Sequence, residues 1–155
     1  MSKVYVYTRN SNAEAFEKGS SRETQIKKCR NYASIKDLIV DEVIEEQCSG
    51  QIPFERREKA FELLRKLKTN DHIICSHLDR FCRNTLSLLQ TIQKFKKKKI
   101  YLHFVDLNCE TTGSDAIGNV FLTMLSCFAQ FQAEQTSQKI KSYKERMKTE
   151  NKFSG

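Results

Sequence analysis

The stretch VYVYTRNS, residues 4–11, alternates apolar and polar side chains and then presents an arginine and a serine. Alternation with a period of two residues is typical of a half-buried β-strand. This strand therefore delivers Tyr7, Arg9 and Ser11 toward its carboxyl end. Whether that placement matters depends on what the rest of the chain brings to the same edge of the sheet.

Strand and helix patterns alternate through the first two thirds of the chain. This order is typical of an α/β domain with a mainly parallel sheet flanked by helices. We assign this α/β core to residues 1–113. The predicted strands are Lys3–Thr8, Leu38–Ile44, Asp71–Ser76 and Ile100–Val105, and the predicted helices are Arg22–Ser34, Arg57–Leu67 and Thr85–Phe95.

The last third, residues 114–155, has the pattern of one long C-terminal helix with an apolar half and a basic half. Its apolar half is too wide and aromatic for a solvated tail, so we expect it to pack on this domain, on a second copy, or on both. The apolar residues are Ile117, Phe121, Met124, Leu125, Phe128 and Phe131. The basic half, which we expect to be poorly ordered until it contacts a partner of opposite charge, carries Lys139, Lys141, Lys144, Arg146, Lys148 and Lys152.

Two polar runs have simpler interpretations. The run FKKKKI, residues 95–100, is interpreted as a solvated turn whose lysines favour the end of the preceding helix. The run SNAEAFEKGSS, residues 11–21, is polar and contains Gly19 and two serines besides Ser11, so it predicts a mobile loop beside the first strand. Loops at strand ends are where functional sites are often built.

Length and composition predict one soluble domain, and the net charge points toward a polyanion as a partner, although many basic proteins bind none. The 155 residues carry a net charge of +8, and six scattered cysteines without a CxxC pair indicate reduced thiols rather than a zinc or redox site. The amino terminus lacks a signal-peptide pattern, and we find no apolar run near the roughly 18 residues that span a bilayer. We therefore expect a cytoplasmic protein.

Reactive side chains follow three of the predicted strands. After Ser11 come SGQIPFERR, residues 49–57, and HLDRFCRN, residues 77–84, which contribute several arginines and Asp79. Carboxyl ends of parallel strands meet at one edge of a sheet. Guanidinium groups match phosphate oxygens and stabilise the charge of a phosphoryl-transfer transition state. No HExxH, P-loop or two-metal carboxylate pattern is present, so phosphoryl transfer onto a serine without a metal or cofactor fits this constellation.

A simpler interpretation of each residue remains open. The serine could lie in a turn, the arginines could form surface ion pairs, and Asp79 could cap the following helix. Motif matches of this length have many false positives. Their joint placement at three strand ends favours the functional interpretation.

Several motifs, in the same order, resemble those of the serine recombinases, the resolvase and invertase group. They cover nearly the whole chain: YTRNS, RETQ, EEQCSG with Arg57, HLDRFCRN, and GNVFLTMLSCFAQFQAEQTSQKIK. The spacing from Ser11 to Gln25 resembles most the large serine integrases and transposon recombinases. The resemblance implies a site-specific recombinase that acts on double-stranded DNA as a dimer and, in the synaptic complex, as a tetramer.

The resemblance also implies a role for individual residues. Ser11 would attack a DNA phosphodiester to form a covalent 5′-phosphoserine, followed by strand exchange and religation. Arg9, Arg80 and Arg83 would hold the phosphate, Asp79 would organise the site or donate a proton, and Tyr7, Gln25 and Arg57 would support it, with Arg56 a rival for Arg57. Lys66, Lys139, Lys141, Lys144, Arg146 and Lys148 would contact DNA, and Ile117, Phe121, Met124, Phe128 and Phe131 would form the dimer interface.

Some positions depart from the family pattern. Gln132 and Ala133 replace an acidic residue and an arginine after the last aromatic, Lys139 replaces a later arginine, and Asn10 replaces an aliphatic residue. These changes spare the residues that would hold the phosphate, but they leave open whether the oligomer contacts and the control of activation follow the family. The family typically continues into a separate DNA-binding domain. We expect no such domain within residues 1–155, which are either part of a longer protein or a naturally minimal one.

Two other functions remain open from the sequence. One is a non-catalytic protein of the same fold that binds DNA or modulates recombination, which Gln132 and Ala133 motivate. The other is a small phosphatase or nucleotide hydrolase that uses Ser11.

Overall fold

A five-stranded, mostly parallel sheet forms the centre of the molecule. The computed structural model describes residues 1–11, 21–113 and 115–153. The strand order is β2-β1-β3-β4-β5, in which the first four strands are parallel and β5 is antiparallel to β4. The strands are β1 Val4–Asn10, β2 Glu42–Gln47, β3 His72–Cys75, β4 Tyr101–Phe104 and β5 Cys109–Glu110. The predicted α/β architecture is confirmed.

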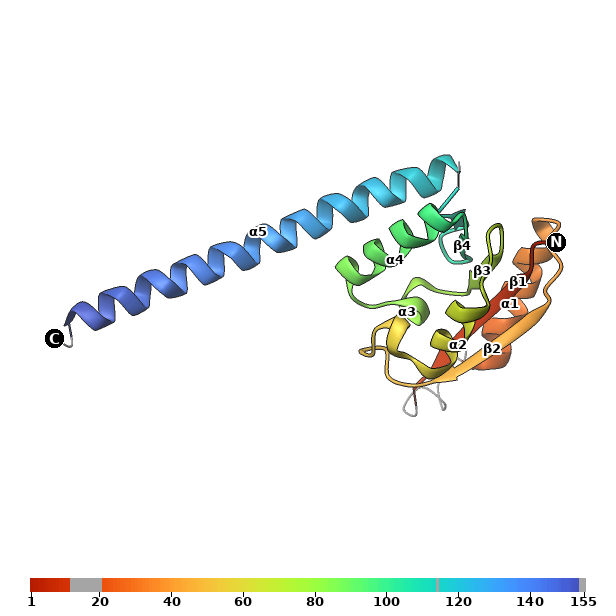
Figure 1. The fold of residues 1–155 in the computed structure, drawn as a ribbon, viewed down its shortest axis with the longest axis horizontal. Coiled ribbons are helices and arrows are strands. Elements are labelled where there is room, and N and C mark those ends of the chain that lie inside the picture. Colours follow the sequence, from red (N-terminus) through yellow and green to blue (C-terminus); the bar gives the residue numbers. More distant parts are fainter. Residues whose placement is uncertain (12–20, 114, 154–155) are drawn as a thin grey trace.

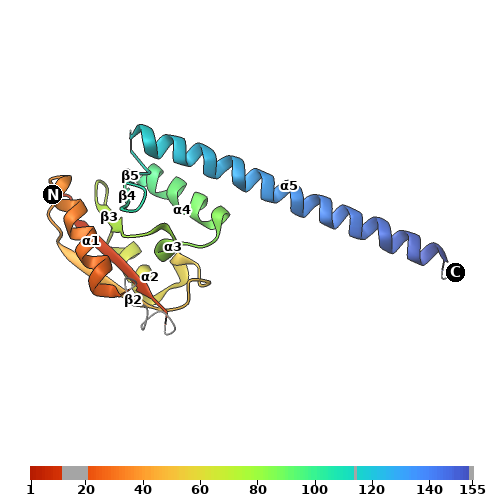
Figure 2. The same ribbon diagram turned by 180° about the vertical axis from the view of Figure 1, so that it is seen from behind.

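Helices cover both faces of this sheet (Figures 1 and 2). Helix α1 packs on one face through Cys29, Tyr32 and Ala33, against Val4, Val6 and Ile74. The other helices cover the opposite face, and the first half of α5 lies along α4 while its second half projects away from the body. The helices are α1 Arg22–Ile35, the 3₁₀ turn η2 Phe54–Arg56, α2 Glu58–Lys66, α3 Leu78–Phe81, α4 Thr85–Lys98 and α5 Ala116–Phe153.

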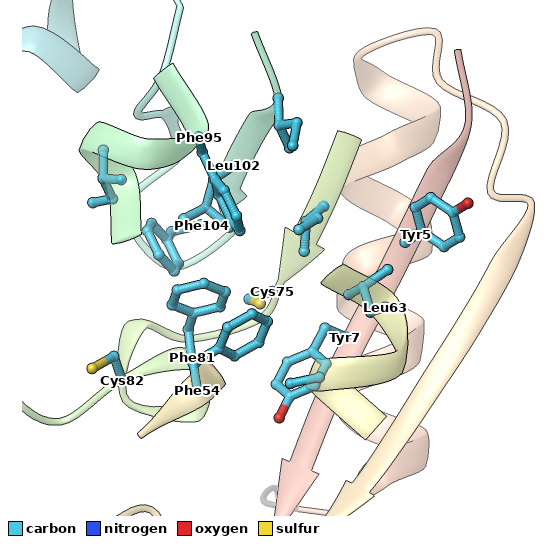
Figure 3. Packing of buried hydrophobic residues seen from close by; sticks show 14 of the residues in the cluster. Tyr5, Tyr7, Phe54, Leu63, Cys75, Phe81, Cys82, Phe95, Leu102 and Phe104 are labelled. Carbon is cyan, nitrogen blue, oxygen red and sulfur yellow. The ribbon is translucent and has the colours of Figure 1, made fainter. Parts of the chain in front are cut away.

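Aromatic rings fill the larger core beneath η2, α3 and α4 (Figure 3). Phe54 stacks on Phe81 with ring centroids 4.1 Å apart, and Tyr7 meets Phe54 edge-to-face at 5.1 Å. Phe81 also meets Phe104 of β4 edge-to-face at 5.9 Å. These contacts tie α3 and η2 to the end of β1, so the segment carrying Asp79 and Arg80 is fixed by packing as well as by hydrogen bonds.

The predicted second strand, Leu38–Ile44, is wrong by several residues. The end of α1 turns through Asp37, whose φ of 55° lies in the left-handed region, and residues 36–41 form a loop. Pairing with β1 begins at Glu42 and runs to Gln47. β2 is an edge strand whose glutamates alternate between solvent and interior, so the apolar run before it was mistaken for the strand. The short elements η2, α3 and β5 were also not predicted.

Helix α5 presents two different apolar faces. Gly118, Leu122 and Leu125 face the body: Gly118 is buried and both leucines pack against the core. Phe121 also packs against this core, with its ring centroid 6.5 Å from that of Phe104. Part of the apolar half therefore packs on this domain, as one of the expected alternatives has it, and the role of Phe121 in a dimer interface stays a prediction. A separate face is exposed to solvent and consists of Ile117, Val120, Met124, Phe128 and Phe131.

The second half of α5 is helical in the structure, which differs from the expected disorder of residues 139–152. The helix continues unbroken to Phe153, since the sequence between Gly118 and Phe153 contains no glycine or proline and is rich in helix-forming residues. By length and composition α5 also contains one window apolar enough to cross a bilayer. That overturns the expectation of no such run, although the lysine-rich continuation of the same helix is a poor match to a membrane span.

Two simpler interpretations are confirmed. Lys96, Lys97 and Lys98 form the exposed last turn of α4, and Lys99 ends it in the left-handed conformation. All six cysteines are free thiols, of which four are buried. The predicted loop at residues 11–21, including Gly19, falls mainly outside the described residues.

Candidate active site

The site begins where β1 ends. Ser11, which is partly buried, directly follows the last strand residue, Asn10. The backbone before it is held by Gln25 of α1: the Arg9 amide donates to Gln25 Oε1 at 3.2 Å, and Gln25 Nε2 donates to the Arg9 carbonyl at 3.3 Å. Gln25 is placed for this by the first turn of α1, which Ser21 caps. The side chain therefore fixes the backbone that presents the serine.

Asn10 also hydrogen-bonds to Gln25. Its Oδ1 accepts a hydrogen bond from Gln25 Nε2 at 2.6 Å, and its side chain is buried. Asn10 is one of the positions that departs from the family pattern, and no role for it was predicted. Asparagine is unfavourable in a buried strand, and that mismatch was the signal in the sequence.

Arg9 is buried and directs its guanidinium group at the backbone of two neighbouring segments. Nε donates to the carbonyl of Arg80 at 3.2 Å, Nη2 to that of Asp79 at 3.3 Å, and Nη1 to that of Cys48 at 3.0 Å. Arg80 Nη1 in turn donates to the Arg9 carbonyl at 3.3 Å. These bonds join β1, α3 and the end of β2 at one edge of the sheet, as the sequence predicted.

Arg57, rather than Arg56, belongs to this cluster. Its Nη1 donates to Tyr7 Oη at 3.1 Å and to the Arg80 carbonyl at 2.9 Å, and its Nε donates to the Ile52 carbonyl at 3.0 Å. Arg57 is 1% exposed, whereas Arg56 lies at the surface. No acceptor within the described ranges lies in hydrogen-bond reach of Arg57 Nη2.

The cluster is a concentration of positive charge inside the protein. Arg9, Arg57 and Arg80 are all buried, and guanidinium groups remain charged under all ordinary conditions. One buried carboxylate lies nearby, Glu46, which accepts a hydrogen bond from the amide of Ala60 at 2.9 Å in the first turn of α2. Glu46 was not predicted either. A buried group of cations is costly unless anions approach it, which suits an anionic ligand.

Neighbouring titratable groups respond to this environment. Burial raises the pKa of Tyr7 strongly, and the adjacent guanidinium of Arg57 opposes the rise only in part. Burial also raises the pKa of the Cys48 thiol, against the opposing charges of Arg57 and Arg9. Both side chains are therefore neutral at physiological pH, and Tyr7 serves Arg57 as a neutral hydrogen-bond acceptor.

Asp79 and Arg83 lie at the outer side of the cluster. Both are exposed, and Asp79 does not cap the following helix, because Asn84 Oδ1 accepts the amide of Ser87 at 2.9 Å in that role. Arg83 lies against Gly50: a Cβ at Gly50 would come within 2.6 Å of Arg83 Nε. Because Gly50 has no side chain, the Arg83 side chain can pack directly against the loop after β2.

Lys66 is not brought to this edge. Its Nζ pairs with Glu42 Oε1 at 2.9 Å, and Glu42 lies at the start of β2, opposite Tyr5, whereas Gln47 pairs with Asn10 beside the serine. The two ends are about 17 Å apart along the strand. Lys66 therefore lies outside the arginine cluster, and its contact with DNA stays a prediction. Among the described residues, no group of carboxylates, histidines or thiols could hold a metal ion.

Comparison with known proteins shows to which family the chain belongs. The family model "Resolvase, N terminal domain" matches residues 4–153. The chain belongs to this family. As a resolvase-family domain it is 26% identical over 134 residues to the transposon Tn2501 resolvase of Escherichia coli, covering 86% of this chain and 65% of that protein. It is 25% identical to the serine recombinase PinR of Escherichia coli K12, covering 86% and 64%.

Solved structures agree with this assignment. The resolvase-family domain described here superimposes on the N-terminal catalytic domain of TP901-1 integrase with a TM-score of 0.73 and 26% identity, covering 86% of this chain and 98% of that one. A resolvase family recombinase from Streptococcus pneumoniae shares the fold, with a TM-score of 0.67 and 20% identity over 96% of this chain and 99% of that one. The predicted resemblance to serine recombinases is confirmed. The chain spans about two thirds of the length of the curated resolvases it matches.

Proposed function

We propose that this chain is the catalytic domain of a site-specific DNA recombinase with Ser11 as its nucleophile. The observation that carries the proposal is the position of Ser11 directly after β1, where Arg9, Arg57 and Arg80 are joined by hydrogen bonds. A phosphodiester beside Ser11 would supply the anion that this buried positive charge favours.

The proposed reaction exchanges one phosphoester for another. Ser11 Oγ attacks the phosphorus, its proton leaves, and the bond to the 3′ oxygen breaks, which gives a 5′-phosphoserine and a free 3′-hydroxyl. In religation a 3′-hydroxyl attacks the same phosphorus and the Ser11 oxygen leaves and regains a proton. Because each step replaces one phosphoester by another, the cycle consumes no nucleotide.

The arginines divide into two groups in this proposal. Arg83 and Arg80 are the proposed contacts to phosphate oxygens: Arg83 is exposed just beyond α3, and Arg80, although largely buried, belongs to α3 itself. Arg9 and Arg57 lie behind them and act through the field of their charges and by holding the Arg80 backbone. Asp79, exposed beside them, is the candidate organiser or proton donor.

Helix α5 supports the proposed dimer and DNA contacts. Its exposed face has large apolar side chains, with Ile117, Val120, Met124, Phe128 and Phe131 each more than half exposed. An apolar face of this size is typical of a protein interface. Farther along, Lys141, Lys144 and Lys148 share one side of the helix and Lys139 and Arg146 another, all exposed, as expected for contacts to DNA phosphates. Because the proposed substrate is DNA, we also propose that the protein acts in the cytoplasm.

Trapping a covalent adduct tests the nucleophile. The full chain is mixed with a supercoiled plasmid library that carries a randomised segment, and DNA linked to protein is detected after denaturation. We expect an adduct whose phosphoserine maps to Ser11 by mass spectrometry, and none with Ser11→Ala. The matched control is Ser34→Ala, which alters an exposed serine of α1. Adduct formation by Ser11→Ala would assign the nucleophile to another residue.

The arginine variants test the phosphate contacts in the same assay. Arg80→Ala is expected to slow adduct formation by about 100-fold or more, the typical effect of losing one oxyanion donor. Lysine at position 80 should restore little, because an ammonium group cannot make the bidentate contact. The control is Arg30→Ala, at an exposed position of α1. Equal rates for the two alanine variants would contradict the assigned role.

Sedimentation tests the dimer interface. Phe128→Glu should shift the chain from dimer to monomer without loss of folding, because Phe128 is exposed. Thr123→Glu is the control, since Thr123 is also exposed but lies on a different side of α5. A wild-type chain that stays monomeric at high concentration, or a Phe128→Glu variant that keeps the dimer mass, would contradict the interface.

A non-catalytic, DNA-binding protein of the same fold is the second candidate. It is favoured by Gln132 and Ala133, and by the burial of Arg9 and Arg57, whose guanidinium groups contact protein carbonyls. The adduct assay separates the two functions. A wild-type chain that binds the library but forms no adduct would favour the non-catalytic candidate.

A further inference from the structure

The last residues of β1 have a neighbouring strand on one side only. β2 pairs with β1 as far as Asn10, whereas β3 pairs with it only as far as Tyr7. Residues 8–10 therefore form an open edge on the β3 side, directly before Ser11. Backbone groups on such an edge need other partners, because a buried N–H or C=O without a hydrogen bond is costly.

Gln25 of α1 takes the place of the missing strand at this edge. Its side-chain amide bonds both the N–H and the C=O of Arg9, through Oε1 at 3.2 Å and Nε2 at 3.3 Å. The same Arg9 carbonyl accepts a hydrogen bond from Arg80 Nη1 at 3.3 Å. The orientation of the Gln25 amide therefore bears on the backbone before Ser11 and on a guanidinium group that is proposed to contact phosphate.

Asn10 favours one orientation of that amide. Gln25 Nε2 donates to Asn10 Oδ1 at 2.6 Å, which is shorter than either of its bonds to the Arg9 backbone. Asn10 is 6% exposed and Gln25 is 1% exposed, so little water reaches either side chain. A Gln25 amide turned by 180° would set its oxygen against the Arg9 carbonyl and its nitrogen against the Arg9 amide, and it would lose the bond to Asn10 Oδ1.

Packing alone does not account for an asparagine at this position. Side chains alternate along a strand, so Asn10 lies on the same face of β1 as Val4 and Val6, which pack in the apolar core under α1. An aliphatic side chain suits such a position, and asparagine is unfavourable in strands. The polar side chain is therefore explained by its bond to Gln25.

We propose that Asn10 is a positioning residue for the reaction at Ser11. It acts through Gln25, by holding the amide that fixes the Arg9 backbone and, through the Arg9 carbonyl, the side chain of Arg80. The inference rests on the proposed function. It adds a residue on the face of β1 opposite to the Arg9 side chain.

Single-turnover adduct formation on the plasmid library tests this inference. Asn10→Val removes the acceptor of Gln25 Nε2 and keeps a side chain suited to a buried strand. We expect the rate at saturating chain concentration to fall by about 5-fold, the effect of losing one hydrogen bond. The chain concentration that gives half the maximal rate should stay unchanged, because Asn10 does not contact the phosphate. An unchanged maximal rate would overturn the inference.

Thr8→Val is the matched control. Thr8 is buried on the same face of β1, and its Oγ1 donates to the Ile44 carbonyl at 3.3 Å. This variant also loses one buried hydrogen bond, but not one to Gln25, so its maximal rate should equal that of the wild type. Equal falls in rate for Thr8→Val and Asn10→Val would reduce Asn10 to a general contribution to stability and overturn the inference.

A double-mutant cycle with Gln25→Met tests the route of the effect. Methionine at position 25 keeps the length of the side chain but removes the amide that Asn10 holds. In that background Asn10→Val should change the maximal rate little, because residues in one hydrogen-bond network are not additive. The same 5-fold fall in both backgrounds would show that Asn10 does not act through Gln25 and would overturn the inference.

Amide hydrogen exchange, followed by NMR, gives a readout without DNA. The Arg9 amide donates to Gln25 Oε1, whereas the Cys48 amide donates to the Asn10 carbonyl at 3.1 Å and reports the pairing of β1 with the end of β2. Asn10→Val should speed exchange of the Arg9 amide by about 5-fold and leave the Cys48 amide unchanged. Equal acceleration at both amides would mean that the end of β1 loosens as a whole, which would overturn the inference.

The two kinds of measurement separate this inference from the recombinase function. Adducts formed at the same rate by the wild type and by Asn10→Val would overturn the role of Asn10 and leave the recombinase function intact. A wild-type chain that forms no adduct would overturn both, whatever the exchange of the Arg9 amide.

Discussion

Replacing Tyr7 by phenylalanine removes one oxygen atom from the centre of the arginine cluster. Tyr7 is 0% exposed and its Oη accepts a hydrogen bond from Arg57 Nη1 at 3.1 Å. Arg57 then keeps the carbonyls of Arg80 and Ile52 as acceptors. A hydrogen bond to a charged group contributes about 1.5–3 kcal/mol, and its loss leaves a buried donor without a partner. We expect the free energy of unfolding to fall by about 2 kcal/mol.

Denaturant unfolding of the full chain measures this change. A loss of about 2 kcal/mol corresponds to a fall in Tm of about 4–8 °C for a chain of this length. The matched control is Tyr5→Phe: Tyr5 lies on the same strand and is 3% exposed, but within the described part of the chain its hydroxyl makes no side-chain hydrogen bond. It should cost about 0.5 kcal/mol or less. Equal losses for both variants would refute the assigned bond between Tyr7 and Arg57.

Three other perturbations have defined outcomes. Gly118→Ala should destabilise the chain in thermal unfolding, since its Cβ would lie 2.0 Å from the backbone carbonyl oxygen of Glu110; an unchanged Tm would contradict that packing. Burial and a neighbouring imidazole lower the pKa of His103 from 6.5 to about 3. The stability that comes from keeping His103 neutral should therefore be fully present above pH 6.5 and decline as the pH falls toward 3. In unfolding curves, His103→Asn should reduce this loss of stability at acid pH. Truncation after Gln138 should reduce the slope of log affinity for duplex DNA against log salt by about 3.6, the value for about four phosphate contacts; an unchanged slope would indicate that residues 139–152 do not contact DNA.

The sequence predicts the architecture well where apolar periodicity is strong. Strands such as His72–Cys75 are buried on both faces, and the helix at Thr85–Lys98 has a regular apolar stripe, so both were located to within a few residues. The second strand was misplaced because β2 is an edge strand, in which Glu46 faces inward and Glu45 outward. Hydrophobicity carries little information about such a strand.

The sequence predicts that several arginines cluster at one edge of the sheet, but it does not predict how they are arranged there. Placing reactive residues at the ends of parallel strands correctly brings Arg9, Arg57 and Arg80 together. The sequence does not reveal that Arg9 and Arg57 are buried, because burial of a cation depends on backbone carbonyls. These are supplied by α3 and by the loop between β2 and η2, two short segments without a recognisable pattern. It also does not reveal Asn10 as a partner of Gln25, which depends on the approach of α1 to β1.

The shared carbonyl of Arg80 affects how any loss of activity should be interpreted. Arg9 Nε and Arg57 Nη1 both donate to it, at 3.2 and 2.9 Å, and Arg80 Nη1 donates back to the Arg9 carbonyl at 3.3 Å. Removing either of the first two guanidinium groups therefore moves Arg80, which is itself the candidate phosphate ligand. An alanine at position 9 would lose activity whether or not Arg9 contacts DNA, since groups in one hydrogen-bond network do not act additively. A double-mutant cycle between positions 9 and 80 separates the two cases. If Arg9 acts mainly by positioning Arg80, Arg9→Ala should reduce activity little in a chain that already carries Arg80→Ala. If Arg9 contacts the phosphate directly, Arg9→Ala should reduce activity by the same factor with or without Arg80→Ala.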